Sequence, residues 1–334
     1  MKLNIIETEK AIKCIKTIFE QHLSTNLNLL RVSAPKFIKT NTGIQDDLAN
    51  TCTSVKFNVP SCGYDVEIVH SLAKWKRLML QKYGMEVYQG LYTDMDAIRK
   101  DEVLDSIHSI YVDQWDWELC ISRSDRSKIF LFNIVKKIYD AIVKTQQHIQ
   151  LTYGVCNNTL PENITPIHTE ELEQMYPTSS RKERENLITK KYGAVFLIGI
   201  GHSLSDGSPH DIRAVDYDDW STEGTIGDLT TFGLNGDILV WNEVLHSAFE
   251  LSSMGIRVDA TALKTQADIM KAPINTFYHQ QVLDETIPFS IGGGIGQSRL
   301  CMFLLDKQHI GEVQVSEWSQ SIIDNCAANG ITLL

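Results

Sequence analysis

The segment from Ser109 to Glu118 constrains the fold of this 334-residue chain more than any other, because polar and aromatic residues alternate along it. Successive side chains of a β-strand point to opposite faces, so Gln114, Asp116 and Glu118 share one face while the two tryptophans share the other. The polar face carries too many charges for a core. It is therefore either the wall of a cleft or a solvent-exposed face of a sheet.

The other periodic segments predict an α+β fold in one domain that spans residues 1–334. Helical spacing from Glu7 to Leu27 predicts an amphipathic helix, followed by a strand that Pro35 terminates. The order of the elements favours a mostly antiparallel sheet flanked by helices. Residues 154–190 contain three prolines and predict a partly helical surface insertion. Further expected elements are a strand and basic helix over 66–83, a helix over 127–150, strands over 194–200, 237–241 and 248–253, and a helix after residue 296.

Composition excludes several classes of protein. The net charge of −11 disfavours a nucleic acid partner, because binding to a phosphate backbone needs clustered Lys and Arg. The first ten residues lack the apolar core of a signal peptide or membrane span, so we expect no membrane contact and a cytoplasmic protein. Seven scattered cysteines without a CxxC pair predict reduced thiols.

A glycine-rich run, Gly292–Gly296, precedes the last predicted core helix. It fits neither the Gly-x-Gly-x-x-Gly pattern nor a phosphate-binding P-loop, so any nucleotide binds in another way. The glycines would let a ligand approach the backbone closely, and Arg299 could present a planar cation to phosphate. A tight packing joint between strand and helix explains the run equally well.

Other polar residues suggest a site for a small zwitterion. Arg99 could hold a phosphate while Gln114 and Asp116 receive an amino group. The basic helix 70–77 could bind a carboxylate, although alone it is typical of a solvated face. Glu250 could chelate Mg²⁺. Five aspartates, with His202 and His210, crowd residues 201–220 and indicate a solvated acidic loop more than a metal cluster.

These pieces, in this order, resemble the three signature regions of the class II aminoacyl-tRNA synthetase catalytic core. The helix and strand ending at Pro35 resemble the dimer-forming region, residues 99–118 the ATP-binding strand pair, and residues 292–299 the third region. Longer strings resemble the ammonia-dependent asparagine synthetase family, the aspartate-ammonia ligases. Among them are VHSLAKWKR (69–77), LNGDILVWN (234–242), ELSSMGIRVD (250–259) and IGGGIGQSRL (291–300).

The resemblance implies a homodimeric ligase that converts L-aspartate, ammonia and ATP to L-asparagine, AMP and pyrophosphate through a β-aspartyl-adenylate, with Mg²⁺. Lys2 stands where a glutamine-using enzyme needs a cysteine, so free ammonia is the expected donor. The alternative is a synthetase-like paralogue that forms an aminoacyl-adenylate for another acceptor, or one that only binds an amino acid in a regulatory role. The acidic charge and the lack of sequence for an anticodon-reading domain argue against a tRNA acceptor.

The resemblance also assigns site residues. The carboxylates of aspartate are assigned to Ser71, Lys76 and Arg257, and its amino group to Gln114, Asp116 and Asp218, with Arg213 a weaker candidate for the same pocket. ATP contacts are assigned to Arg99, Ser109 and Arg299, and the nucleotide and Mg²⁺ site to Asp237, Glu250 and Ser253. Asp46 would lie near the ammonia and accept a proton. The expected catalytic residues are Asp46, Lys76, Arg99 and Arg299.

Overall fold

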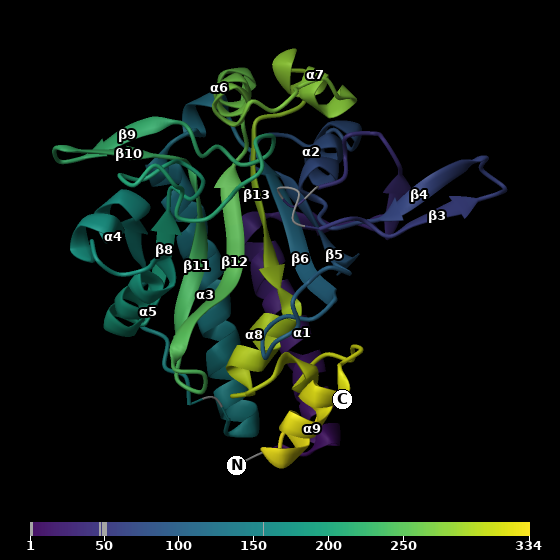
Figure 1. Cartoon of the computed structure of the whole chain (residues 1–334), viewed down its shortest axis with the longest axis vertical. Helices are drawn as coiled ribbons and strands as arrows, with labels where there is room; N and C mark the ends of the chain where they lie inside the picture. The colour runs from purple at the N-terminus through teal and green to yellow at the C-terminus, as the bar shows by residue number, and fades with distance from the viewer. Residues whose placement is uncertain (1–2, 47, 49–51, 156) are drawn as a thin grey trace.

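The computed structural model describes residues 3–46, 48, 52–155 and 157–334, and a large mixed sheet forms its centre (Figure 1). Across the sheet lie β1 (Leu29–Arg31), β5 (Gly90–Ile98), β6 (Tyr111–Cys120), β13 (Ser290–Gly296), β12 (Ser247–Ile256), β11 (Asn235–Asn242), β8 (Ala194–Ile198) and β7 (Thr165–His168). The six inner strands are antiparallel, while β1 and β7 add parallel edges. The predicted α+β, mostly antiparallel fold is confirmed.

One face of the sheet packs against helices. α1 (Ile5–Leu27) and α3 (Lys128–Tyr153) lie behind the strands in Figure 1, and α8 (Gln297–Leu304) contacts α1 at their lower end. Phe19 of α1 packs on Trp115 of β6 with ring centroids 4.6 Å apart. Trp115 and Trp117 are both fully buried. The aromatic face of the alternating strand therefore forms the core, and its polar face is left for other contacts.

The polar face is covered only in part. α2 (Ala73–Lys82) packs against β5 and β6, and α6 (Ala260–Met270) and α7 (Phe277–Leu283) lie nearby at one end of the sheet (Figure 1). A small sheet of β2 (Phe37–Lys39), β4 (Tyr64–Ile68) and β3 (Lys56–Val59) projects on one side, and the hairpin β9 (Glu223–Ile226) and β10 (Leu229–Phe232) projects on the other. The chain also contains the short helices η2 (Arg123–Asp125), η3 (Ile310–Glu312) and α9 (Gln320–Ala328).

The segment 154–190 differs from the expected surface insertion. It is partly helical, through α4 (Thr169–Met175) and α5 (Arg181–Tyr192), but β7 also extends the main sheet by pairing with β8. Ile167, Leu172 and Ile188 are buried in a second hydrophobic cluster with β8. Pro166 fits because an edge strand leaves one side of its backbone without a sheet partner. Cys156 lies outside the described residues.

The described helices include none with the length and apolar character that crossing a bilayer requires.

Candidate active site

Two adjoining cavities lie on the polar face of the sheet. The small cavity has a volume of about 120 Å³ and the large cavity about 300 Å³, and Arg99, Gln114 and Gly294 line both. The predicted residues that line the small cavity are Asp46, Ser71, Lys76, Arg99, Gln114, Asp116, Asp218, Ser253 and Arg257. Those that line the large cavity are Arg99, Ser109, Gln114, Glu250 and Arg299. The fold thus brings together residues that are far apart in the sequence.

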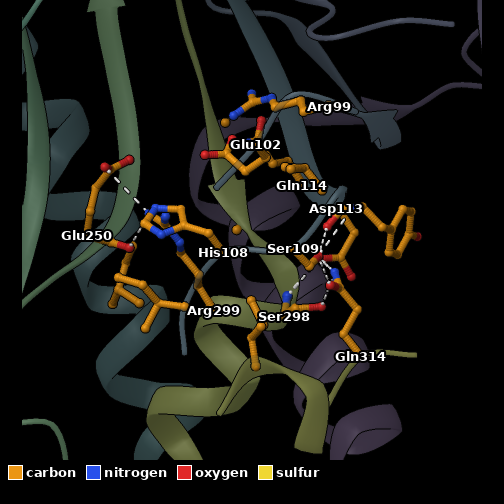
Figure 2. A pocket seen from close by; sticks show the side chains of 17 residues that line it. Arg99, Glu102, His108, Ser109, Asp113, Gln114, Glu250, Ser298, Arg299 and Gln314 are labelled. Atoms are coloured by element: carbon orange, nitrogen blue, oxygen red, sulfur yellow. Dashed lines mark hydrogen bonds and ion pairs between the residues drawn. The ribbon is translucent and has the colours of Figure 1, made fainter. Parts of the chain in front are cut away.

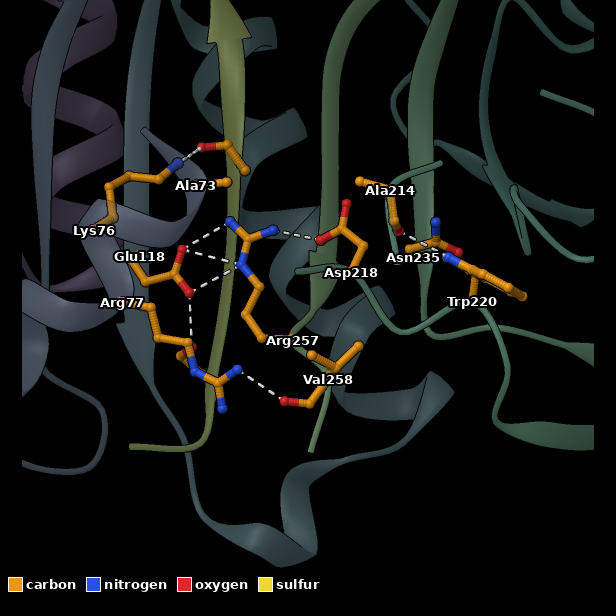
Figure 3. A network of polar contacts seen from close by, with 12 residues as sticks. Ala73, Lys76, Arg77, Glu118, Ala214, Asp218, Trp220, Asn235, Arg257 and Val258 are labelled. Carbon is orange, nitrogen blue, oxygen red and sulfur yellow. Dashed lines mark hydrogen bonds and ion pairs between the residues drawn. The ribbon is translucent and has the colours of Figure 1, made fainter. Parts of the chain in front are cut away.

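A buried ion-pair network fixes Arg257 at the small cavity (Figure 3). Its Nε lies 3.0 Å from Glu118 Oε1, its Nη2 lies 2.7 Å from Glu118 Oε2, and its Nη1 donates to Asp218. Ser290 donates a further hydrogen bond to Glu118. Burial opposes ionisation of Glu118, but the Arg257 guanidinium holds the pKa of that carboxyl below its usual value. For Asp218 burial prevails and raises the pKa, although Arg257 opposes it.

Lys76 presents a second buried cation to the small cavity. Its Nζ donates to the Gly293 carbonyl at 2.8 Å and lies 3.3 Å from Asp116 Oδ2. Burial lowers the pKa of Lys76, and the neighbouring Asp116 only partly opposes this. The interpretation of helix 70–77 as a solvated basic face is wrong, because Lys74, Lys76 and Arg77 are all buried. The sequence could not reveal that α2 packs against the charged face of β6.

The glycine run is part of β13, where it makes room for side chains of the neighbouring strand. A methyl group at Gly292 would overlap the Glu118 carboxylate, and one at Gly294 would overlap the Gln114 amide and lie 2.8 Å from Asp116. Neither glycine has a positive φ, so space and not backbone torsion requires it. The polar side chains of β6 can therefore lie across β13, which explains why Gly292 and Gly294 have no side chains.

Two arginines line the large cavity with few strong partners (Figure 2). Arg299 Nη1 lies 3.3 Å from the Glu250 carbonyl and 3.5 Å from its carboxylate. Arg99 donates to the His70 carbonyl at 3.3 Å, and its buried Nε has no hydrogen-bond partner among the described residues. Both guanidinium groups can therefore bind an anion without breaking a strong ion pair.

Sequence reasoning missed the residues that hold Ser109. The Ser109 hydroxyl donates to Gln314 Oε1 at 2.6 Å, and Gln314 Nε2 donates to Ser298 Oγ at 3.1 Å. Gln314 follows the last helix of the core without any motif, so no local signal could have found it. Glu102 and His108 also line this cavity. They lie in the connection between β5 and β6, within the range 99–118 that resembles the ATP-binding strand pair, but the resemblance gave them no role.

Arg213 and Asp237 line neither cavity and instead pair with each other. Arg213 Nη2 lies 2.6 Å from Asp237 Oδ2. Burial raises the pKa of Asp237 to about 7 although Arg213 opposes the shift, and the nearby Glu250 carboxylate raises it further. Asp237 Oδ1 is buried without a hydrogen-bond partner among the described residues. The carboxylates of Asp237 and Glu250, with the unpartnered Oδ1 of Asp237, fit a hard cation such as Mg²⁺.

The acidic loop is less solvated than expected, although Asp206 and Asp211 remain exposed. Asp206, Asp211, Asp216, Asp218 and Asp219 pair with Arg181, Arg213, Lys74, Arg257 and Arg126, respectively. Three of the five aspartates are buried. No group of three or more His, Cys, Asp or Glu side chains in the described part of the chain is arranged to hold a metal ion. These ion pairs pin the loop beside the small cavity.

Asp46 also lines the small cavity and is only 3% exposed. The backbone N–H of Leu48 donates to its Oδ1 at 2.9 Å. Burial raises the pKa of Asp46, and the charge of Lys74 is the largest opposing influence. Of its close sequence neighbours, residues 47 and 49–51 lie outside the described part.

Solved structures of the same fold are class II synthetases. The asparaginyl-tRNA synthetase of Entamoeba histolytica, in complex with asparaginyl-adenylate, aligns with a TM-score of 0.65 at 13% identity and covers 93% of this chain. That of Pyrococcus horikoshii, complexed with asparaginyl-adenylate, gives 0.65 at 13% identity and covers 92% of this chain. This chain spans only 66% and 68% of those two chains. At these identities the likeness shows the fold alone.

Full-length relatives are much more similar. Aspartate--ammonia ligases of Malacoplasma penetrans and Parabacteroides distasonis are each 52% identical over 99% of this chain, covering 99% and 96% of the relatives. That of Fusobacterium nucleatum is 50% identical over 99% of this chain and 98% of its own length. The family model described as aspartate-ammonia ligase matches residues 6–330. The chain therefore belongs to the aspartate-ammonia ligase family.

Proposed function

We propose that this protein is an ATP-dependent ligase that converts L-aspartate and ammonia to L-asparagine, with AMP and pyrophosphate as the other products. One observation carries the proposal: Arg99, Gln114 and Gly294 line both cavities. A carboxylate bound in the small cavity and the α-phosphate of a nucleotide in the large cavity would meet at this shared wall. The names of the relatives support the substrates and the overall reaction.

The small cavity suits a zwitterion with two carboxylates. The cations of Lys76 and Arg257, with the Ser71 hydroxyl, would hold the carboxylates of aspartate. The acceptors of Gln114, Asp116 and Asp218 would receive its ammonium group. Because Arg257 is fixed by buried acids, it offers a preformed position and not a mobile charge. Arg213 does not line the small cavity, so it would affect aspartate binding only indirectly.

The large cavity would bind ATP. Arg99 and Arg299 would contact the phosphates, and Ser109 the nucleoside part of the molecule. Glu250 and Asp237 would hold Mg²⁺, beside Ser253, and the metal would neutralise charge on the phosphate oxygens.

The chemistry follows from the weakness of a carboxylate as an electrophile. An oxygen of the aspartate side chain attacks the α-phosphorus, so that an O–P bond forms while the bond to pyrophosphate breaks. Arg99 and Arg299 neutralise charge that develops in this step. Ammonia then attacks the acyl carbon of the adenylate and the C–N bond forms. The nitrogen loses a proton to solvent, and AMP leaves with the electrons of the C–O bond.

Ammonia requires a base, because it is almost wholly protonated at neutral pH. Asp46 lines the small cavity, and burial raises its pKa, so its carboxylate is a stronger base than an exposed aspartate. It would bind ammonium and take one proton before the attack. Replacing Asp46 with Asn should raise the ammonium concentration needed for half-maximal rate while pyrophosphate exchange persists. An unchanged dependence on ammonium would remove Asp46 from this role.

Product analysis tests the function directly. Incubation with ATP, L-aspartate and ammonium should give AMP, pyrophosphate and asparagine in equal amounts. Release of ADP and phosphate would contradict adenylation. Exchange of pyrophosphate into ATP should need aspartate but not tRNA, which separates the proposed function from a synthetase acting on tRNA.

We further propose a homodimer formed through the helix and strand that end at Pro35. β1 is an edge strand, and exposed apolar side chains lie along this element, with Leu30 59% and Ile6 67% exposed. Analytical ultracentrifugation of the parent and of Leu30→Lys should show a dimer that the charge weakens. A cytoplasmic site fits the free thiols of the described cysteines.

A further inference from the structure

Lys74 is a buried cation that the proposed reaction does not use. It lies on α2 two residues before Lys76, but it lines neither cavity. The residue is only 7% exposed, and its Nζ lies 2.6 Å from Asp216 Oδ2. Burying a lysine is costly unless its charge serves a partner, so this pair needs an explanation beyond stability.

His279 on α7 binds the same carboxylate oxygen. Its Nε2 lies 2.9 Å from Asp216 Oδ2, while its Nδ1 faces the backbone N–H of Thr276 at 3.3 Å. The neutral tautomer with hydrogen on Nε2 satisfies both contacts. Burial opposes ionisation of Asp216, but the hydrogen bond from His279 and the charge of Lys74 hold its pKa below the usual value. Asp216 thus remains an anion that anchors Lys74.

This network reaches the segment that carries Asp46 by two routes. At the N-terminus of α7, Thr276 packs so closely on Gly43 that a methyl group at Gly43 would overlap the threonine side chain. The second route is electrostatic, because Lys74 is the cation with the largest effect on Asp46. Among the described residues, the other charged or titratable groups that interact with Asp46 include Asp216, Arg99, His70 and Tyr217.

We propose that Lys74, anchored by Asp216 and His279, is a positioning residue for the ammonia step, which keeps the Asp46 carboxylate ionised and in place to receive ammonium. Because Lys74 lines neither cavity, it would not touch the adenylate, and the first half of the reaction should not depend on it. This inference rests on the proposed function, in which Asp46 binds ammonium.

The test compares two half-reactions in Lys74→Met, Lys74→Arg and the parent. Aspartate-dependent exchange of pyrophosphate into ATP, without ammonium, reports adenylation. The pH profile of kcat/KM for ammonium reports the ionisation of Asp46. Burial raises the pKa of Asp46, and the Lys74 cation opposes this effect. Without that cation the pKa of Asp46 rises further, so the acid limb of the profile moves to higher pH. Lys82→Met, at an exposed position on the same helix, is the matched control.

In Lys74→Met we expect exchange within about twofold of the parent. The acid limb should move up by about one pH unit, with about a tenfold loss of kcat/KM for ammonium on that limb. Lys74→Arg should restore most of the loss, and Lys82→Met should match the parent. A parallel fall in exchange and in ammonium use, or an acid limb that does not move, would overturn the proposal.

A second variant covers the case in which Lys74→Met does not fold. His279→Leu removes one of the two hydrogen-bond donors to Asp216, so the Asp216 carboxylate neutralises more of the Lys74 charge. The acid limb of the pH profile should then also move to higher pH, by less than in Lys74→Met. An unmoved limb in this variant also overturns the proposal. If the proposed function itself were wrong, the parent protein would form no asparagine, and this outcome differs from an acid limb that does not move.

Discussion

The two cavities hold their cations in opposite ways. In the small cavity, Arg257 and Lys76 are buried and each contacts at least one buried carboxylate. Among the described residues, the polar partners of Arg299 in the large cavity and of Arg99, which lines both cavities, are backbone carbonyls at 3.3 Å and one carboxylate at 3.5 Å. A small zwitterion is recognised by fixed charges of both signs, whereas a flexible polyphosphate needs cations that remain available. The comparison predicts that removing a cation costs stability in the first cavity and ligand affinity in the second.

The largest effect is expected from Arg257→Met. The change leaves Glu118 and Asp218 buried without their cation, which should lower the free energy of unfolding by about 3–5 kcal/mol. Urea denaturation measures the loss. The control is Arg31→Met, whose 2.6 Å pair with Asp94 is largely exposed and should contribute less than about 1 kcal/mol. Equal losses in the two variants would contradict the assignment of Arg257 to a buried network.

Arg299→Met should show the reverse pattern. The KM for ATP should rise about 30-fold, equivalent to about 2 kcal/mol for a lost charge-assisted contact, while the free energy of unfolding changes by less than about 1 kcal/mol. Initial rates and urea denaturation give the two numbers. Arg123→Met, which removes an exposed partner of Glu285, should change neither. A stability loss as large as that of Arg257→Met would erase the difference between the cavities.

Gly294→Ala tests the wall that the cavities share. The added methyl group would displace Gln114 and crowd Asp116, so the KM for aspartate should rise about tenfold, equivalent to about 1.4 kcal/mol. Steady-state kinetics with each substrate in turn measures it. Gly224→Ala is the matched control, because its methyl group would meet chiefly the flexible end of Lys128. A change in the KM for ATP alone would place Gly294 in the large cavity only.

The smallest effect is a change in the pH dependence of stability. The folded pKa of Glu118 lies below its unfolded value of about 4.3, so its stabilisation is full above that pH and disappears as the pH falls through the folded pKa. Glu118→Gln should therefore flatten the acid decline of the unfolding free energy. The pKa of Asp218 is raised in the folded protein, so ionisation of Asp218 makes the protein less stable as the pH rises above about 3.9. Asp218→Asn should abolish this decrease in stability. Urea denaturation from pH 3 to 7 measures both slopes.

The strand β6 was predictable because its information is local. Alternation placed Trp115 and Trp117 on one face and Gln114, Asp116 and Glu118 on the other, and the structure confirms this division. The helix α1 was equally clear from its spacing. The strand β7 was missed because Pro166 argues against a strand unless the strand lies at an edge, and edge position depends on the neighbours.

The choice of site residues was predictable only through resemblance, and their grouping needed the fold. The assigned set divides between two cavities, and Arg213 and Asp237 pair with each other outside both. The functional assignment of each residue stays a prediction. The burial of Lys74 and Lys76 was missed because a short basic helix has the same sequence whether it faces water or a charged sheet.

The sequence by itself determined the class of fold, the face of β6 that enters the core, and the family, because periodicity and long strings are local properties of the chain. Only the tertiary structure decided which acid neutralises which base. Arg257 meets Glu118 across 139 positions and Lys74 meets Asp216 across 142, and a charge pair in a buried site depends on distances that no local pattern contains.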